Sequence, residues 1–586
     1  MIPLLSIILL LAIVSANYAP QKVGCPAGRL IREAKGLSKQ EADWVANKKT
    51  TEHLKLFLET SNLTDFDANA FLTDTDHNIK IGLAFSGGGF RAMLCGAGFM
   101  SALDNRTRGA HEHGLGGLLQ ASTYMSGLSG GSWLVGSVVS NNFTSVQDIM
   151  DNKTKIWDLT YSILDAKGSG IFNIVKYYLQ LIADVLLKKM AGFQTTLTDL
   201  WGRALSHHFF GGTNYGDDLF WSGVQNMTAF INHDMPYPIV IANAVDPGNK
   251  KVNNDSAIVE ITPFEIGSWD PALNSFMETK YMGSNVTNGM PVEQSCVNGF
   301  DNAGFLLGAS STLFNEVFGN SVTGRINETA FNSTVGKELD SALSSASDVD
   351  HFVAVVKPNP FRNVQEAGNK NITGDDILSL VDGGEDSENV PLYPLVQEAR
   401  EVDVVFAYDS SADTAVDWPN GNAMYQAYER QFTEQGKTMS VPKIPTKEVF
   451  LLGGLTSKPV FFGCDANAPS EITNGNNATG VSGNLTLANS TLTNLGKKVP
   501  PLIVYTANRK LSFDSNKSTF TFVYTEAEKA GMVRNGFEVA TRNNGTEDSA
   551  WKTCVSCAII RREQERRNME QSDQCKQCFE KYCWRG

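Results

Sequence analysis

The chain has 586 residues, of which 42% are hydrophobic, so it is long enough to bury one or two cores of domain size. Its formal net charge is −14, and its basic residues are scattered along the sequence. These features argue against a nucleic-acid-binding protein and against strong electrostatic adsorption to an anionic membrane.

The N-terminal residues predict export. Residues 3–14 form an apolar run of 12 residues without a charge, which is shorter than the roughly 20 residues of a membrane span. The small residues VSA suit cleavage after Ala16, so residues 1–16 are predicted to be a signal peptide. Because no Lys or Arg precedes the run, a buried strand or helix at a cytosolic N-terminus is the alternative.

Fifteen Asn-x-Ser/Thr sequons, spread from Asn62 to Asn544, extend this prediction. One sequon is close to a chance event, but this number fits a glycoprotein with many surface loops. The chain ends in KYCWRG without a long apolar stretch, so no transmembrane tail or anchor signal is expected. We therefore expect a freely secreted extracellular glycoprotein.

Strand-like and helix-like segments alternate after a polar, helical region at 17–78, which is expected to wrap around the fold. The strand-like run 79–85 and the helix-like run 90–103 are followed by a second pair, 121–126 and 132–140. Alternation of this kind, with glycine turns leading into helices, predicts an α/β fold. Further strands are expected at 237–245, 256–267, 351–357, 402–409 and 500–506.

Two other segments have distinctive patterns. Residues 173–193 carry a periodic apolar face through Leu181, with Asn173 as a candidate N-cap and Gly192 as a C-terminal stop. An ordinary core helix is favoured there over a mobile lid that enters a lipid interface. The polar segment 467–496 carries three sequons and is predicted to be a glycosylated surface insertion.

Five of the nine cysteines lie in the last 33 residues. Cys554-x-x-Cys557 and Cys575-x-x-Cys578 are separated by 17 residues, a spacing that also fits a four-cysteine zinc site. Because the chain is predicted to be exported, disulfides are favoured over zinc.

The remaining cysteines complete a hypothesis of four disulfides and one thiol. Cys583 is left over by the two CxxC pairs and is expected to bond a distant partner, with three candidates: Cys25, Cys296 and Cys464. Cys95 lies in a helix-like segment of small residues, where a small buried hydrophobe fits, so it is the expected free thiol.

A candidate nucleophile lies in the stretch YMSGLSGGSW. Residues 127–131 fit Gly-x-Ser-x-Gly between a strand-like and a helix-like run. A nucleophile on a tight strand-to-helix turn needs neighbours without bulk, and the turn presents the Ser129 hydroxyl at a helix N-terminus, which favours a developing alkoxide. Glycine- and serine-rich turns are common, so the pattern is weak by itself.

The earlier stretch SGGGFRAML supplies complementary groups. A glycine run that leaves a strand and enters a helix can offer backbone N–H donors to an oxyanion, and Gly88 and Gly89 are the candidates. Arg91 stands in the first turn of that helix, a poor place for a cation unless an anion is near. We expect its guanidinium to bind a substrate phosphate, with a salt bridge to Asp or Glu as the alternative.

The same glycines permit a different interpretation. Gly87-x-Gly89-x-x-Ala92 after a strand resembles a dinucleotide-binding fingerprint, with Asp104 as a ribose-binding acid. A secreted destination makes a nicotinamide or flavin partner the less favoured reading.

The candidate base is an aspartate. Asp382 ends an apolar run and meets Gly383 and Gly384 in SLVDGGEDSENVPLYPL. No histidine follows it in the sequence, as the serine–acid–histidine order of α/β-hydrolases requires, although a triad through His233 or His351 stays open. A dyad of Ser129 and Asp382 is the simpler hypothesis.

With these elements in place, the sequence resembles the secreted fungal phospholipase B, or lysophospholipase, family. It is also similar to the catalytic domain of calcium-regulated cytosolic phospholipases and more distantly to patatins. The matching segments cover most of residues 25–550, and they are SGGGFRAM, GLSGGSW, PFEIGSWDP, NGFDNAGFLLGASSTLFN and LVDGGEDSENVPLYPL.

The resemblance implies a mixed central sheet flanked by helices, with one catalytic domain at 17–550 and a Cys-rich tail at 551–586. It implies Ser129 as nucleophile, Asp382 as its partner, Gly88 and Gly89 as oxyanion donors, and Arg91 as phosphate ligand. No metal or cofactor is implied, and calcium dependence is not carried over because no calcium-dependent membrane domain is evident.

The implied reaction is hydrolysis of the fatty-acyl ester of phospholipids and lysophospholipids, met at a micelle or membrane surface. It passes through an acyl-enzyme, whose acyl group is transferred to water or to a second lysophospholipid. Because an aspartate titrates near pH 4 unless burial raises its pKa, we predict appreciable activity at pH 4–5. A loss of activity with an apparent pKa between 6 and 7 would instead favour a histidine base. The alternatives are a Ser-His-Asp esterase on neutral esters and a catalytically inactive binding glycoprotein.

Overall fold

The computed structural model describes residues 18–74, 77–164, 171–212, 214–247, 252–253, 255–292, 295–315, 317, 353–464 and 499–586. The predicted signal peptide at 1–16, the predicted insertion at 467–496 and His351 lie outside these residues.

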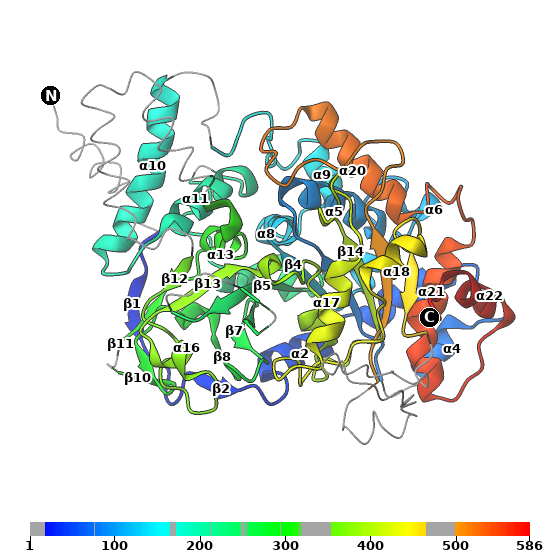
Figure 1. The fold of residues 1–586 in the computed structure, drawn as a ribbon, viewed down its shortest axis with the longest axis horizontal. Coiled ribbons are helices and arrows are strands. Elements are labelled where there is room, and N and C mark those ends of the chain that lie inside the picture. The colour runs from blue at the N-terminus through cyan, green and yellow to red at the C-terminus, as the bar shows by residue number, and fades with distance from the viewer. Residues whose placement is uncertain are drawn as a thin grey trace, which may run out of the picture.

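A mixed sheet of twelve strands runs through the middle of the molecule (Figure 1). Its order is β15-β16-β14-β3-β4-β5-β6-β7-β8-β2, and β13 pairs with β5 and with β12. The segment from β16 through β14, β3 and β4 to β5 is parallel, and the remaining pairings are antiparallel. The strands of this sheet are β2 (Ile31–Glu33), β3 (Ile81–Phe85), β4 (Tyr124–Leu128), β5 (Tyr237–Val245), β6 (Ala257–Ile261), β7 (Glu265–Ser268), β8 (Ser275–Glu278), β12 (Ala354–Val356), β13 (Leu378–Asp382), β14 (Val404–Asp409), β15 (Val460–Phe462) and β16 (Leu502–Ala507).

The predicted α/β alternation is confirmed, with one strand divided. All residues of β3, β4 and β14 are buried, as expected for parallel strands covered on both faces. The single strand expected at 256–267 is two strands, β6 and β7, because the chain turns at 262–264 and β7 pairs back on β6. Pro263 in that turn cannot donate to a sheet ladder, which explains the break.

Helices lie on both sides of this sheet, with α5, α8 and α20 on one side and α2 and α17 on the other (Figure 1). The helices are α2 (Lys39–Asn47), α3 (Thr50–Glu59), α4 (Ala68–Thr73), α5 (Gly89–Leu103), α6 (Ala110–His113), α7 (Leu118–Ala121), α8 (Gly130–Ser140), α9 (Val146–Met150), α10 (Ile171–Met190), α11 (Leu197–Phe209), α12 (Thr228–Ile231), α13 (Ala303–Ala309), α16 (Lys370–Gly374), α17 (Asn422–Arg430), α18 (Lys447–Leu452), α20 (Glu526–Ala540), α21 (Trp551–Arg566) and α22 (Asp573–Tyr582).

Short 3₁₀ segments and minor strands complete the described chain. They are η1 (Trp221–Asn226), η2 (Thr279–Tyr281), η3 (Thr312–Phe314), η4 (Gly383–Asp386), η5 (Tyr393–Val396), β1 (Gln21–Gly24), β9 (Val286–Thr287), β10 (Met290–Pro291) and β11 (Ser295–Asn298).

Helix α5 is buried along its whole length because it lies between the sheet and α20. Two glycines allow this close packing. A Cβ at Gly98 would lie 2.0 Å from the Val533 carbonyl oxygen, and one at Gly536 would lie 2.2 Å from the Cys95 carbonyl oxygen. The small residues of α5 therefore serve helix packing, and they fix the helix that begins in the glycine stretch.

The N-terminal region is only partly the helical wrap that was expected. Helices α2, α3 and α4 are present, but β2 forms the edge of the main sheet beside β8, and β1 pairs with β11. The periodic pattern of short strands at a sheet edge is too brief to detect from sequence.

The expected core helix at 173–193 is confirmed as α10, with Leu181 and Val185 fully buried. It begins at Ile171, so Asn173 lies inside the helix and is not its N-cap, and Gly192 with φ +94° follows its end. Across the described ranges, α10 included, no helix has both the length and the apolar composition that a membrane crossing requires.

The cysteine hypothesis is confirmed in full. Cys464 bonds Cys583, and Cys95 is a buried free thiol. The other three bonds are Cys25–Cys296, Cys554–Cys578 and Cys557–Cys575.

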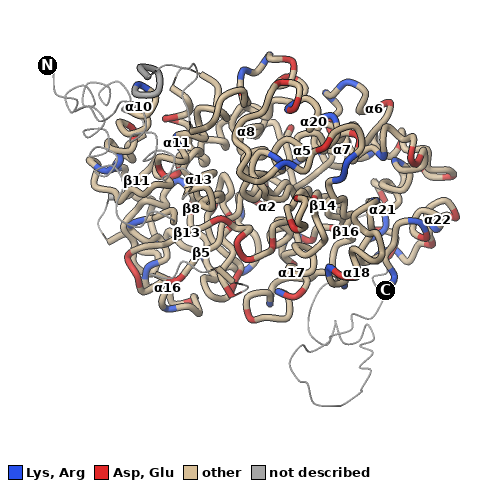
Figure 2. The backbone as a smooth tube through the Cα atoms, turned by 45° about the horizontal axis from the view of Figure 1, so that its top comes forward, with Lys and Arg blue, Asp and Glu red and all other residues tan. Residues whose placement is uncertain are grey.

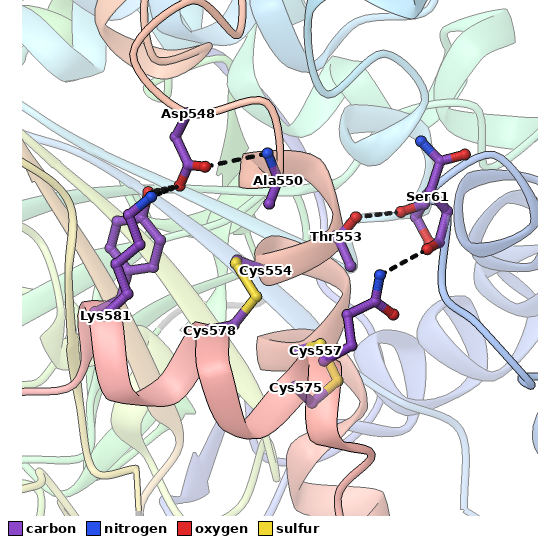
Figure 3. The surroundings of a disulfide bond; sticks show 12 residues. Ser61, Asp548, Ala550, Thr553, Cys554, Cys557, Cys575, Cys578 and Lys581 are labelled. Carbon is purple, nitrogen blue, oxygen red and sulfur yellow. Dashed lines mark hydrogen bonds and ion pairs between the residues drawn. A yellow bond between two sulfur atoms is a disulfide. The ribbon is translucent and has the colours of Figure 1, made fainter.

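The C-terminal tail is a helical hairpin that two disulfides tie together (Figure 3). Helix α21 packs against β14 and β16, and Thr553 donates a hydrogen bond to the Ser61 carbonyl oxygen of the N-terminal region at 2.7 Å. Basic and acidic residues are interspersed over the whole molecule (Figure 2).

Candidate active site

Ser129 lies on a strained turn between β4 and α8. Its backbone has φ +48° and ψ −118°, a conformation that L-residues rarely adopt and that a surrounding structure must enforce. Glycines on either side make the turn possible, because a Cβ at Gly131 would lie 2.0 Å from the Phe85 carbonyl oxygen and one at Gly130 would lie 2.1 Å from the Gly89 carbonyl oxygen. The predicted strand–serine–helix turn is present, and its hydroxyl lies at the N-terminus of α8.

The register of β5 brings Asp382 to this serine. Leu128, the last residue of β4, pairs with Ile241, and Asp382, the last residue of β13, pairs with the next residue, Ala242. Strands β4 and β13 therefore occupy successive stretches of the same edge of β5 and meet end to end. The Ser129 hydroxyl donates a hydrogen bond to Asp382 Oδ2 at 2.9 Å.

The second oxygen of Asp382 is fixed as well. Its Oδ1 accepts from the Gly384 N–H at 2.9 Å, which closes the turn of η4. Burial raises the pKa of Asp382 to about 7, opposed by the hydrogen bonds from Gly384 and Ser129, and the Asp386 carboxylate raises it further. The prediction of appreciable activity at pH 4–5 therefore loses its support, because a base with this pKa is largely protonated there.

The glycine loop after β3 lies directly against Ser129. A Cβ at Gly87 would lie 3.0 Å from the Ser129 Cβ. Gly88 (φ +129°) and Gly89 (φ +61°) have backbone conformations that favour glycine, and within the described chain no acceptor engages the N–H of either residue. Their N–H groups are therefore available to a developing oxyanion.

Arg91 is 1% exposed and makes no salt bridge to a described carboxylate, so the alternative role in an ion pair finds no support. Its Nε donates to the Ser410 carbonyl oxygen at 2.9 Å, and its Nη1 donates to the Lys517 carbonyl oxygen and the Thr519 hydroxyl. Nη2 is buried without a hydrogen-bond partner, and a Cβ at Gly88 would lie 2.3 Å from it. Burial lowers the pKa of this guanidinium, and the unsatisfied donor beside the glycine loop suits an anion.

The described residues give no support to a triad through His233 or to a dinucleotide site, whereas His351 lies outside them. No described histidine forms a hydrogen bond with Ser129 or Asp382. Asp104 lies at the far end of α5, where Arg106 binds its carboxylate, so it is not placed to bind a ribose at the glycine loop.

Three positioning residues, which make four hydrogen bonds, were missed from the sequence. Ser310 Oγ accepts from the Ser129 N–H at 3.0 Å, and Thr312 Oγ1 accepts from the Asp382 N–H at 2.9 Å. Asn389 Nδ2 donates to the Gly87 carbonyl oxygen at 3.1 Å, and Gly87 N–H donates to the Asn389 carbonyl oxygen at 3.0 Å. These residues lie in the quoted family segments, but no local pattern separates them from ordinary turn residues.

The mixed central sheet flanked by helices is an α/β fold of the kind found in the catalytic domain of cytosolic phospholipases. The solved structure of human GIVD cytosolic phospholipase A2 matches with a TM-score of 0.60 and 14% identity, covering 93% of this chain and 72% of that one. Its complex with methyl gamma-linolenyl fluorophosphonate matches with a TM-score of 0.56.

Sequence comparison identifies the family within that class. The family model described as the lysophospholipase catalytic domain matches residues 81–586. Lysophospholipase 3 of Candida albicans is 47% identical over 97% of this chain and 74% of its own length, and lysophospholipase 3 of Saccharomyces cerevisiae is 44% identical over 97% and 81%. The chain belongs to the lysophospholipase family and is an ester hydrolase of this class.

Proposed function

We propose that the protein hydrolyses the acyl ester of lysophospholipids and phospholipids with Ser129 as nucleophile and Asp382 as general base. The hydrogen bond of 2.9 Å from the Ser129 hydroxyl to Asp382 Oδ2 carries this proposal. An ionised carboxylate at this distance can take the hydroxyl proton as the oxygen attacks the ester carbonyl.

The reaction proceeds in two steps. Ser129 Oγ attacks the carbonyl carbon while Asp382 accepts its proton, and the oxyanion forms against the N–H groups of Gly88 and Gly89. Collapse of the tetrahedral intermediate expels the glycerol oxygen, which takes the proton back from Asp382, and leaves an acyl-serine. In the second step Asp382 accepts a proton from water, whose oxygen attacks the acyl-serine carbonyl, and the bond between Ser129 Oγ and the acyl group breaks as Oγ takes the proton back, which releases the fatty acid. When the hydroxyl of a second lysophospholipid takes the place of water, the acyl group is transferred to it and the enzyme acts as a transacylase.

Arg91 supplies selectivity for phosphorylated substrates. Its unsatisfied Nη2 lies next to Gly88, so a phosphate ester near the oxyanion donors finds a charged donor already held in place by Ser410 and Lys517. Such a donor lowers the cost of orienting the head group.

Exposed apolar side chains support contact with an aggregated substrate. Two of them are next in sequence to residues of the site. Leu313 follows Thr312, whose hydroxyl accepts a hydrogen bond from the Asp382 N–H. Phe520 follows Thr519, whose hydroxyl accepts one from Arg91. Leu313 and Phe520 are 43% and 46% exposed. We expect Phe520→Ser to raise KM for micellar substrate and to leave turnover of a soluble short-chain ester unchanged.

The test of the chemistry is fatty-acid release from lysophosphatidylcholine by wild type, Ser129→Ala, Asp382→Asn and Arg91→Ala. We expect near-complete loss for the first two and, for Arg91→Ala, a larger loss on the phospholipid than on a neutral ester. Full activity of Ser129→Ala would refute the proposal and favour a histidine-based site. A purified wild type that neither hydrolyses nor transfers acyl groups would favour a binding glycoprotein.

We also propose that the protein is secreted and glycosylated. Four disulfides favour an oxidising compartment. The sequons at Asn62, Asn152 and Asn544 have exposed asparagines. Expression from the full gene in a yeast host should yield the protein in the medium with a mass that peptide-N-glycosidase reduces. Retention inside the cell with an unchanged mass would contradict the proposal.

A further inference from the structure

A buried ion cluster includes two carboxylates, Asp386 and Glu388, of the segment that directly follows Asp382. Arg430, the last residue of α17, is fully buried and pairs with Glu388 through Nε and with Asp386 through Nη2, at 3.1 Å for the second contact. Its Nη1 lies 3.9 Å from Asp270 Oδ2 and donates to the Ser256 carbonyl oxygen at 3.2 Å. The guanidinium therefore links α17 to the segment 386–388.

That segment connects the two halves of the site. Its N-terminal side is the η4 turn, in which Gly384 N–H holds Asp382 Oδ1 at 2.9 Å. Its C-terminal side is Asn389, which binds the backbone of Gly87 in both directions, at 3.0 and 3.1 Å. Whatever fixes residues 386–388 thus fixes both the orientation of the base and the position of the oxyanion loop.

The buried carboxylates require a cation, and their arrangement suits the planar guanidinium of an arginine better than the ammonium of a lysine. Three carboxylates, from Asp270, Asp386 and Glu388, are buried around Arg430, each at most 3% exposed. Asp386 also orders its own loop, because its Oδ1 accepts from the Glu388 N–H at 2.8 Å. A guanidinium can pair with the two loop carboxylates at once through Nε and Nη2, whereas an ammonium is a point charge on a flexible chain.

We infer that Arg430 is a positioning residue for the reaction, which acts through Asp386 and Glu388 on Asp382 and on the glycine loop. This inference rests on the proposed function of Ser129 and Asp382. It assigns no contact between Arg430 and the substrate, so the loss of its fork changes the rate of acyl transfer more than substrate binding.

Arg430→Lys is the test, and Arg400→Lys is its matched control. Arg400 is also a buried arginine that pairs with two carboxylates, Glu41 and Glu260. Among the described residues, none of its hydrogen bonds or ion pairs reaches the loop 382–389. Both variants replace a buried fork by a point charge, so both are expected to lower the Tm to a similar extent. Only Arg430→Lys is expected to lower kcat, by tenfold or more, with KM changed less than threefold.

The same loss should appear without substrate turnover. A long-chain fluorophosphonate reacts with the activated serine, and its rate of covalent labelling should fall tenfold or more in Arg430→Lys and not in Arg400→Lys. Equal kcat and equal labelling rates in the two variants would overturn the inference, as would a rise in KM alone. If Ser129→Ala retained activity or labelling, the proposed function itself would fail, which distinguishes the two outcomes.

Discussion

Replacement of Asp382 by asparagine should stabilise the protein at alkaline pH while it removes activity. The fold raises the pKa of this carboxyl from 3.8 to about 7, chiefly because burial disfavours its charge. Above pH 7 the carboxyl is ionised in the native and the unfolded state, and in the native state its charge is buried. Below pH 4 the carboxyl is neutral in both states. A group whose folded pKa is raised in this way opposes folding above that pKa, and the penalty disappears as pH falls towards 4.

The pKa rise corresponds to at most about 4 kcal/mol at pH 8, since one pKa unit is about 1.36 kcal/mol. Asparagine can keep both contacts, because its Oδ1 can accept from Gly384 and its Nδ2 can donate to the Ser129 hydroxyl. We therefore expect a gain of about 2–4 kcal/mol in unfolding free energy at pH 8. For a chain of this length, that corresponds to a Tm about 2–3 °C higher.

The assay is thermal unfolding of wild type and Asp382→Asn at pH 8 and pH 4.5, with fatty-acid release measured in parallel. The Tm difference should favour the variant at pH 8 and shrink at pH 4.5. Asp573→Asn is the matched control, because the Asp573 side chain is 93% exposed and the same change of charge there should alter neither the Tm at pH 8 nor the activity. A Tm difference that is equal at the two pH values would refute the reasoning that burial of charge at Asp382 is costly.

Three further predictions follow from the same geometry. The acid limb of kcat/KM should have an apparent pKa near 7, because the base must be ionised and burial raises the pKa of Asp382 to about 7; a flat profile from pH 4.5 to 8 would contradict this. Cys95, whose pKa burial raises to about 11, should resist iodoacetamide at pH 8 until the protein is unfolded, as mass spectrometry can show. Gly130→Ala should lower activity by 100-fold or more and reduce the Tm, because its Cβ would lie 2.1 Å from the Gly89 carbonyl oxygen.

The raised pKa of Asp382 also means that a pH profile alone no longer distinguishes an aspartate base from a histidine base. An aspartate near its usual pKa would have kept activity at pH 4–5, whereas a histidine base would have lost it. Because burial raises the pKa of Asp382 to about 7, an acid limb at that pH fits the aspartate as well as a histidine. Substitution of Asp382 and of His233 separates the two bases, since His233 has no hydrogen bond to Ser129 among the described residues.

Local sequence determined the elements that carry the chemistry. The buried run at 79–85, the glycine turn and the helix that contains Arg91 follow from composition and spacing alone, as does the strained turn at Ser129, which only flanking glycines permit. The disulfide hypothesis followed from cysteine count and predicted export, because an odd total leaves one thiol. Strands, helices and glycine turns follow from residue patterns that a sequence displays directly, whereas the cysteine count does not give the partners, since Cys25 and Cys296 lie 271 residues apart.

Tertiary structure alone decided how these parts meet. Asp382 reaches Ser129 because β4 and β13 pair with successive residues of β5, a register between strands separated by more than a hundred residues. The pKa of Asp382 depends on burial by the whole fold, and Arg430 reaches the catalytic loop from another helix. Pairing register, desolvation and buried charge are sums over distant segments, so no local pattern in the sequence encodes them.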